Sequence, residues 1–291
     1  MKHALLTLAE EKTIIFDGAM GTMLMASGLP LGDNPVLWNL DKASVVINIY
    51  KQYYEAGSDV VHTNTFIGNP LKLAENGILE KTELINMEAA KIARKVCPEG
   101  KFVAGDMGPT GKFFEPLGKL SPEEAEEAYR RQAEALLSGG ADFISIETMF
   151  SLEEALTAVR GAKRAGSILV IASMTYNRTK KGFFTMMGEG VQQALSALEQ
   201  AGADVIGANC TLGSKDMIDL TKEIRVATET PILIQPNAGQ PVMRKGVTTY
   251  DQTPSEFAQD GKEIKAAGAD MIGGCCGTNA EFIRELVKAI S

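Results

Sequence analysis

The sequence lacks several features that would place it in common classes of protein. It has no run of 18 consecutive apolar residues, so no transmembrane helix is expected. The first residues carry Glu10 and Glu11 and no long apolar segment, so they do not resemble a secretory signal peptide. An excess of positive charge is also missing, because the net charge is -8. That balance argues against general binding to nucleic-acid phosphates, and we predict a cytoplasmic protein that binds neither nucleic acid nor membrane.

Glycine motifs for nucleotide binding are missing as well. No Gly-x-Gly-x-x-Gly follows the first predicted strand, which argues against a dinucleotide fold. The glycine-rich turn at residues 17–22 lacks the Gly-Lys-Ser/Thr ending of a phosphate-binding loop. We therefore expect that this turn is a tight bend that brings backbone donors to a carboxylate.

The sequence does contain a repeated unit, in which a short apolar run ends in a polar cluster and an amphipathic segment follows. Eight such runs are rich in Val and Ile and lack two-residue alternation, which suits parallel strands buried on both faces. Eight units in 291 residues predict a single (β/α)8 TIM barrel over residues 1–291, with an open doubly wound sheet as the alternative. The runs are residues 13–17, 59–65, 102–106, 142–147, 168–174, 204–209, 231–235 and 270–274.

Helix starts are marked by a Ser or Thr that stands three residues before a Glu. Ser121, Ser151, Thr253 and Thr278 have this capping-box spacing. The glycines before the predicted strands mark where the preceding helices end.

Polar residues close the predicted strands, and in a barrel these ends all meet at the catalytic face. Capping of the next helix is the alternative for single members such as Thr148 or Thr175. The polar strand-end residues are Asp17, Asn64, Thr65, Asp106, Glu147, Thr148, Thr175, Asn209, Cys210, Gln235, Asn237, Cys275 and Cys276.

Three of the four cysteines belong to this ring. Cys210 closes the sixth strand, and Cys275 and Cys276 close the eighth, so their backbones should lie about 10 Å apart with one strand between them. Three soft thiolates suit zinc and leave its fourth position open, which is typical of a catalytic site. The alternative is that these cysteines are small buried apolar residues, the role that we expect for Cys97. Asn237 is a candidate resting fourth ligand, with a hydrogen-bonding role as the alternative.

Three strings carry a family resemblance. Asp-Gly-Ala-Met-Gly-Thr at 17–22, Asn-Cys-Thr-Leu-Gly at 209–213 and Gly-Gly-Cys-Cys-Gly-Thr at 273–278 together resemble the homocysteine S-methyltransferase family. The first string most resembles the homocysteine-binding module of cobalamin-dependent methionine synthase. The resemblance covers essentially the whole chain, and it implies a (β/α)8 fold and zinc held by Cys210, Cys275 and Cys276.

The resemblance also implies that the chain transfers a methyl group to the thiol of homocysteine, giving methionine. Asp17 and Glu147 would bind the amino group of homocysteine, and backbone N–H groups near Ala19 and Met20 its carboxylate. Thr65 and Asn209 are further expected substrate-binding residues. A glycosidase with Asp17 and Glu147 as its carboxylate pair is a weaker alternative. It leaves the cysteines unexplained, and Trp38 is the only tryptophan for stacking sugars.

The methyl donor is not determined by these residues. The chain has no Asp-x-His-x-x-Gly cobalamin loop, so we expect methylcobalamin or another methyl-corrinoid, or a methylfolate system, on a partner protein or on further domains. The alternatives are direct methyl transfer from S-methylmethionine or betaine, and a zinc- or thiol-binding module without turnover. A thiolate is the nucleophile in such transfers, and three protein thiolates around zinc would keep a bound substrate sulfur electron-rich.

Overall fold

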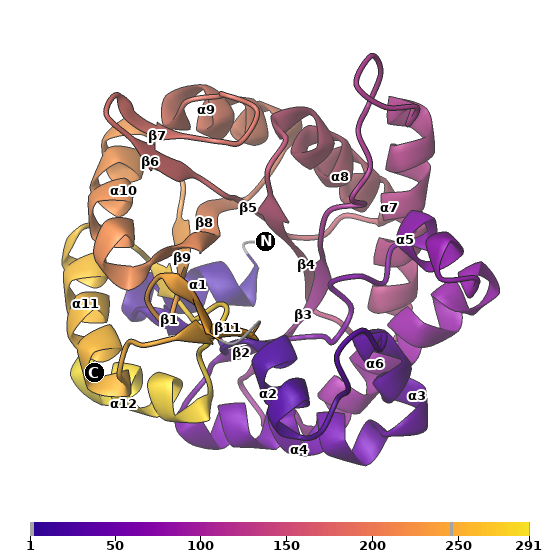
Figure 1. The fold of residues 1–291 in the computed structure, drawn as a ribbon, viewed down its shortest axis with the longest axis horizontal. Helices are drawn as coiled ribbons and strands as arrows, with labels where there is room; N and C mark the ends of the chain where they lie inside the picture. Colours follow the sequence, from indigo (N-terminus) through magenta and orange to yellow (C-terminus); the bar gives the residue numbers. More distant parts are fainter. Residues whose placement is uncertain (1–2, 245–246, 291) are drawn as a thin grey trace.

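The computed structural model describes residues 3–244 and 247–290, which form a barrel of eight parallel strands ringed by helices (Figure 1). The strand order is β1-β12-β9-β8-β5-β4-β3-β2, and a parallel bridge between Phe16 and Val60 joins the two outermost strands. This confirms the predicted (β/α)8 fold, and each expected run overlaps one strand. The strands are β1 (Ile14–Ile15), β2 (Val60–His62), β3 (Phe102–Met107), β4 (Phe143–Met149), β5 (Val170–Met174), β8 (Val205–Gly213), β9 (Ile232–Asn237) and β12 (Met271–Ile272).

The outer layer consists of helices that alternate with the strands. The principal ones are α4 (Ala43–Ala56), α6 (Thr82–Val96), α7 (Pro122–Ser138), α8 (Leu152–Ala165), α9 (Val191–Ala201), α10 (Ser214–Ala227), α11 (Pro254–Ala266) and α12 (Ala280–Ile290). The shorter ones are α1 (Ala4–Glu11), α2 (Met20–Ala26), α3 (Trp38–Asp41) and α5 (Pro70–Glu75), with 3-10 turns η1 (Pro35–Leu37) and η2 (Leu79–Lys81).

Three of the four predicted helix caps are present. Ser121, Ser151 and Thr253 each accept a hydrogen bond from the backbone N–H three residues on. The prediction for Thr278 was wrong, because Asn279 accepts the N–H bonds at the start of α12. The Thr278 hydroxyl instead donates to the carbonyl of Cys275 at 2.7 Å, inside the candidate site.

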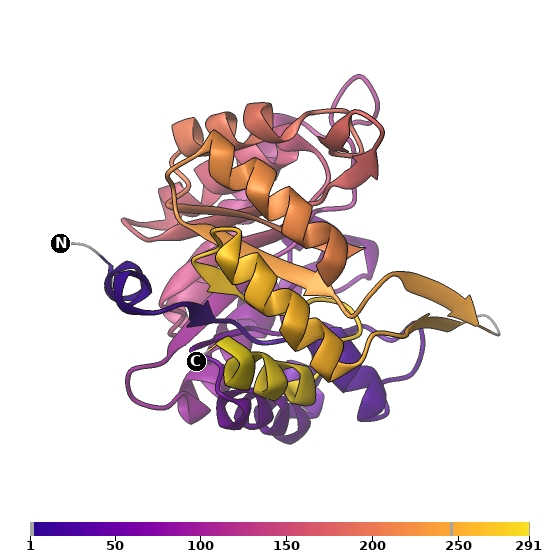
Figure 2. The ribbon, with the colours of Figure 1, turned by 90° about the vertical axis from the view of Figure 1, so that its left-hand side faces the viewer.

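The barrel interior changes from apolar to polar along the strands. At the amino-terminal end, Leu5 of α1 packs into a buried cluster with Ile14, Phe16 and other strand residues. Further along β2 and β4, His62 and Ser145 replace apolar residues and hydrogen-bond to each other. The polar residues therefore gather at the carboxyl ends of the strands, opposite the end that α1 covers (Figure 2).

Two hairpins that were not predicted lie in loops at the site end of the barrel. One consists of β6 (Asn177–Thr179) and β7 (Gly182–Phe184), after β5. The other consists of β10 (Pro241–Arg244) and β11 (Val247–Tyr250), after β9, and projects from the body in Figure 2. Within the described residues, no helix is long and apolar enough to cross a membrane.

Candidate active site

The three ring cysteines come together at the carboxyl end of the barrel. Their sulfur atoms all lie within 4.8 Å of one another, and the Sγ atoms of Cys210 and Cys276 are 3.9 Å apart. All three are free thiols. Residues 65 positions apart in the chain thus form one compact group of soft donor atoms.

Cys210 reaches this group because strand β8 is distorted where it ends. The pairing of β8 with β9 shifts register between Asn209 and Gly213. Within that stretch, Cys210 and Thr211 have positive φ angles of 57° and 60°. Non-glycine residues with such φ angles cost on the order of 1–3 kcal/mol each and persist only where the surroundings impose them. A bulge of this kind re-aims a side chain, here next to Cys276.

The Cys275-Cys276 turn is held by backbone bonds and by glycine. The N–H of Cys275 donates to the carbonyl of Pro236 at 2.7 Å. Gly277 has a φ of 84°, and its N–H donates to the Thr22 hydroxyl at 3.1 Å. A Cβ at Gly277 would lie 2.4 Å from the ring of Tyr250. The turn therefore requires glycine for its backbone conformation and for its contact with β11.

The donor set fits a zinc ion. Hydrogen bonds from Cys210 and Cys275 lower the pKa of Cys276, whereas hydrogen bonding to the other two thiols raises the pKa of Cys275. Three adjacent thiolates would repel one another, so a bound cation would stabilise them together. Three sulfur donors at this spacing match the preference of zinc for soft, tetrahedral sites.

A cavity of about 350 Å³ opens beside the cysteines. All three cysteines line it, and so do four of the expected substrate-binding residues: Ala19, Met20, Thr65 and Glu147. The other two, Asp17 and Asn209, are buried next to the cavity and are not among its lining residues. Further polar lining residues are His62, Thr63, Asn64, Asp106, Thr148 and Gln235.

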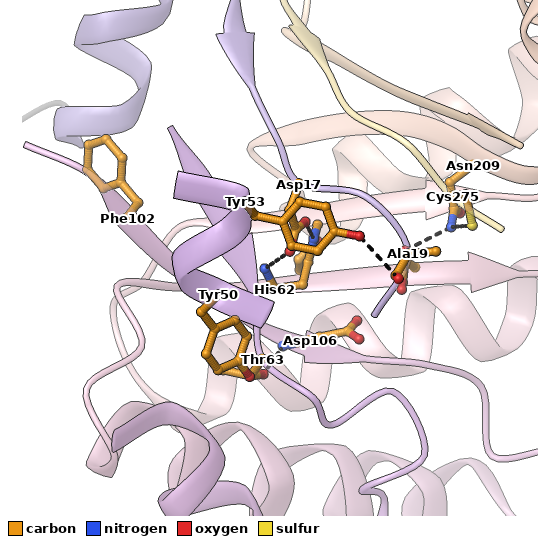
Figure 3. Close-up of polar contacts among 12 residues, drawn as sticks. Asp17, Ala19, Tyr50, Tyr53, His62, Thr63, Phe102, Asp106, Asn209 and Cys275 are labelled. Atoms are coloured by element: carbon orange, nitrogen blue, oxygen red, sulfur yellow. Dashed lines mark hydrogen bonds and ion pairs between the residues drawn. The ribbon is translucent and has the colours of Figure 1, made fainter. Parts of the chain in front are cut away.

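Asp17 contacts His62 with both carboxylate oxygens (Figure 3). Its Oδ2 accepts from the backbone N–H of His62 at 2.9 Å, and its Oδ1 lies 2.8 Å from the ring Nδ1. The other ring nitrogen lies 3.0 Å from the Ser145 hydroxyl. Burial disfavours charge on His62, yet the Asp17 carboxylate outweighs it and raises the pKa of the imidazole to about 9. At neutral pH, Asp17 and His62 therefore form a buried ion pair.

Asn209 fixes Glu147 and Thr148 near the carboxyl end of β4. Its amide Nδ2 donates to Glu147 Oε2 at 2.9 Å and to the Thr148 hydroxyl at 2.8 Å, and its Oδ1 accepts from the Thr148 N–H at 2.8 Å. Thr148 has a positive φ of 61°, at a register shift between β4 and β5. Asn209 thus links the cysteine-bearing strand to the carboxylate-bearing strand, and its Nδ2 lies 3.9 Å from the sulfur of Cys275.

The remaining expected residues form hydrogen bonds with neighbouring residues around the cavity or are buried beside it. Thr65 donates its hydroxyl to the carbonyl of Asp106 at 2.7 Å. The Ala19 N–H donates to the Thr278 hydroxyl at 3.2 Å. Asn237 is buried, and its Oδ1 has no hydrogen-bond partner among the described residues, which leaves that oxygen available for an additional ligand.

Sequence reasoning did not assign roles to two residues of the site, His62 and Asp106. His62 lies inside a predicted strand, and Asp106 was one of many strand-end polar residues. Because the runs lack two-residue alternation, the sequence contains no signal for which of these polar side chains face the cavity.

This fold and site define a class: (β/α)8 barrel proteins with a group of three thiols that could hold a metal ion, beside a small cavity that is lined by two carboxylates. The chain belongs to the homocysteine S-methyltransferase family, whose sequence model matches residues 14–290. This confirms the resemblance seen in the sequence.

Sequence relatives agree with that assignment, and solved structures share the fold. The chain is 33% identical over 306 aligned positions to the methionine synthases of Mycobacterium tuberculosis and Mycobacterium leprae. It spans 99% of its own length in these alignments and only 25% of theirs. The homocysteine methyltransferase MmuM of Escherichia coli, in its metallated form, superimposes with a TM-score of 0.81 at 24% identity, covering 98% of this chain and 99% of that one. The oxidized form of MmuM gives 0.80 at 23% identity. These superpositions show the shared fold.

Proposed function

We propose that this chain is a zinc-dependent methyltransferase that methylates the thiol of homocysteine to give methionine. The observation that carries the proposal is the convergence of Cys210, Cys275 and Cys276 within 4.8 Å on the wall of a cavity that is also lined by two carboxylates, Asp106 and Glu147. Zinc held by these residues would lower the pKa of a substrate thiol and keep it as a thiolate beside the cavity. Family membership supports homocysteine as the methyl acceptor.

The cavity has complementary groups for the two ends of an amino-acid thiol. The cysteine group would receive the sulfur end, while Glu147 lies on the wall and can accept hydrogen bonds from an ammonium group. Backbone N–H groups near Ala19 and Met20, where α2 begins, are the proposed donors to the substrate carboxylate. The Ala19 N–H already donates to the Thr278 hydroxyl, which leaves the Met20 N–H for this contact. Asp17 adds negative charge through its pair with His62, and Thr65 and Asn209 hold the walls.

The methyl donor in this proposal is a methyl-corrinoid or methylfolate system on a partner protein or on further domains. The support is that the methionine synthase relatives are about four times as long as the segment that the chain matches. The corrinoid would be supplied in trans, because the sequence has no Asp-x-His-x-x-Gly cobalamin loop. The cytoplasmic location also stays a prediction.

Zinc analysis with homocysteine titration is the experiment that tests this proposal, and it has a matched control within the chain. We expect one zinc per chain, retained in Cys97→Ser and lost in Cys276→Ser, because only the second cysteine belongs to the group. We also expect homocysteine to bind to the zinc-loaded protein. Retention of zinc by Cys276→Ser would contradict the site.

Turnover is then assayed with three methyl donors: methylcobalamin, S-methylmethionine and betaine. Methionine formed from methylcobalamin alone supports the proposed donor class. If methionine forms with S-methylmethionine or betaine, the methyl group is transferred directly from that donor and the proposed donor class is wrong. Homocysteine binding without product from any donor would indicate a thiol-binding module.

A further inference from the structure

The acidic wall of the cavity contains a carboxylate whose role the proposed function leaves open. Asp106 ends β3 on the cavity wall and is 4% exposed. Its Oδ1 atom is buried and has no hydrogen-bond partner among the described residues. A buried carboxylate oxygen without a donor is costly, so this position calls for a cationic or donor group from a ligand.

The backbone around Asp106 is fixed, so this side chain is held in place. The Asp106 N–H donates to the Thr63 hydroxyl at 2.9 Å, and its carbonyl accepts from the Thr65 hydroxyl at 2.7 Å. In Figure 3 the carboxylate points away from Tyr50 and Thr63, toward the side of the site where Ala19 and Cys275 lie. The carboxylate is thus presented to the cavity by a rigid strand end.

Asp106 and Glu147 both line the cavity, and each affects the pKa of the other. Burial, followed by the charge of Glu147, raises the pKa of Asp106 well above its usual range, and burial also raises the pKa of Glu147. Two neighbouring carboxyl groups in a buried site cannot both be charged at low cost. A substrate ammonium placed between them would neutralise the pair and donate to both side chains.

Asp17 is less available for that contact. Both of its oxygens are already bonded to His62, at 2.9 and 2.8 Å, and it does not line the cavity. His62 contacts Asp17 at hydrogen-bond distance, whereas it affects Asp106 only through its charge and leaves Asp106 Oδ1 without a donor among the described residues.

We infer that Asp106 is a further substrate-binding residue, which together with Glu147 binds the ammonium group of the amino-acid thiol. Asp17 then does not contact the ammonium group itself, and its role is to hold His62 in place. This inference rests on the proposed function and assigns the substrate class more narrowly: thiols that carry an α-ammonium group.

The test compares two thiols on the zinc-loaded protein by calorimetry: L-homocysteine, and 4-sulfanylbutanoate, which has the same chain without the amino group. Asp106→Asn should raise the dissociation constant of homocysteine by about tenfold to a hundredfold, the range for one hydrogen bond to a charged group. The dissociation constant of 4-sulfanylbutanoate should stay within about twofold. Asp33→Asn, which removes the same charge from an exposed loop, should change neither value.

Three results would overturn the inference. If Asp106→Asn raises the dissociation constants of both thiols equally, Asp106 has a purely structural role. If the dissociation constant of homocysteine is unchanged in Asp106→Asn, Asp106 does not bind the substrate. If Asp106→Asn does not fold or retain zinc, Asp106→Ser is measured in the same way, and misfolding of both variants would show that Asp106 is needed for folding.

Failure of the wild type to bind either thiol would instead refute the proposed function itself.

Discussion

Truncation of Asn209 tests how the cysteine and carboxylate halves of the site are joined. Asn209→Ala removes three hydrogen bonds, two to Thr148 and one to Glu147, from a side chain that is fully buried. The Thr148 N–H and the Glu147 oxygen would lose a partner, and each such buried group costs about 1–3 kcal/mol. We therefore expect the free energy of unfolding of the metal-free protein to fall by about 3 kcal/mol in urea titrations. Homocysteine binding to the zinc-loaded variant should weaken about tenfold, because Glu147 is no longer held.

The control is Asn76→Ala, which removes one exposed amide bond to the carbonyl of Lys72. Its free energy of unfolding should stay within about 0.5 kcal/mol of the wild type, as is usual for surface positions. A similarly small change in Asn209→Ala, with an unchanged dissociation constant for homocysteine, would refute the reasoning.

Three further predictions concern the ion pair, the glycine turn and the resting metal. The pKa of His62 rises from 6.5 to about 9 in the folded state, so its stabilisation is fully present below pH 6.5 and is lost as the pH rises through 9. In urea titrations of the metal-free protein, this should appear as about 3 kcal/mol of stability lost between pH 6.5 and 9, a dependence that His62→Gln should lack. Parallel pH profiles for the two proteins would contradict the ion pair. Gly277→Ala should reduce zinc content and stability, because its Cβ would overlap the Tyr250 ring, whereas Gly21→Ala, which meets no atom within 4 Å, should not. Equal zinc contents in Gly277→Ala and Gly21→Ala would contradict the conclusion that the turn requires glycine at position 277. Asn237→Ala should alter the zinc coordination of the substrate-free protein while keeping the metal, and unchanged X-ray absorption spectra would exclude Asn237 as the resting ligand.

The barrel was predictable because parallel strands buried on both faces leave continuous apolar runs in the sequence. Each run from residues 13–17 to 270–274 produced a strand, since buried Val and Ile determine strand position with little help from the loops. The hairpins β6–β7 and β10–β11 were missed because each of their strands has only three or four residues, and those of β6 and β10 are exposed. The mistaken cap at Thr278 shows that spacing alone does not reveal which of two neighbouring side chains faces the helix start.

The composition of the site was easier to predict than its contacts. Counting strand ends placed Cys210 near Cys275 and Cys276, but it could not show the register shift and positive φ angles that bring the sulfurs together. The pairing of Asp17 with His62, and the open carboxylate of Asp106, depend on distances across neighbouring strands. Such contacts arise from barrel stagger, which a sequence pattern does not encode directly.

The central claim is that three sulfurs hold a zinc ion and leave one position for a substrate thiol. Zinc X-ray absorption of the loaded protein, recorded before and after addition of L-homocysteine, tests it most directly. The account predicts three sulfur ligands at about 2.3 Å without substrate and four with it. A zinc ion whose sulfur count stays the same when homocysteine is added, or which has fewer than three sulfur ligands at the start, would contradict it.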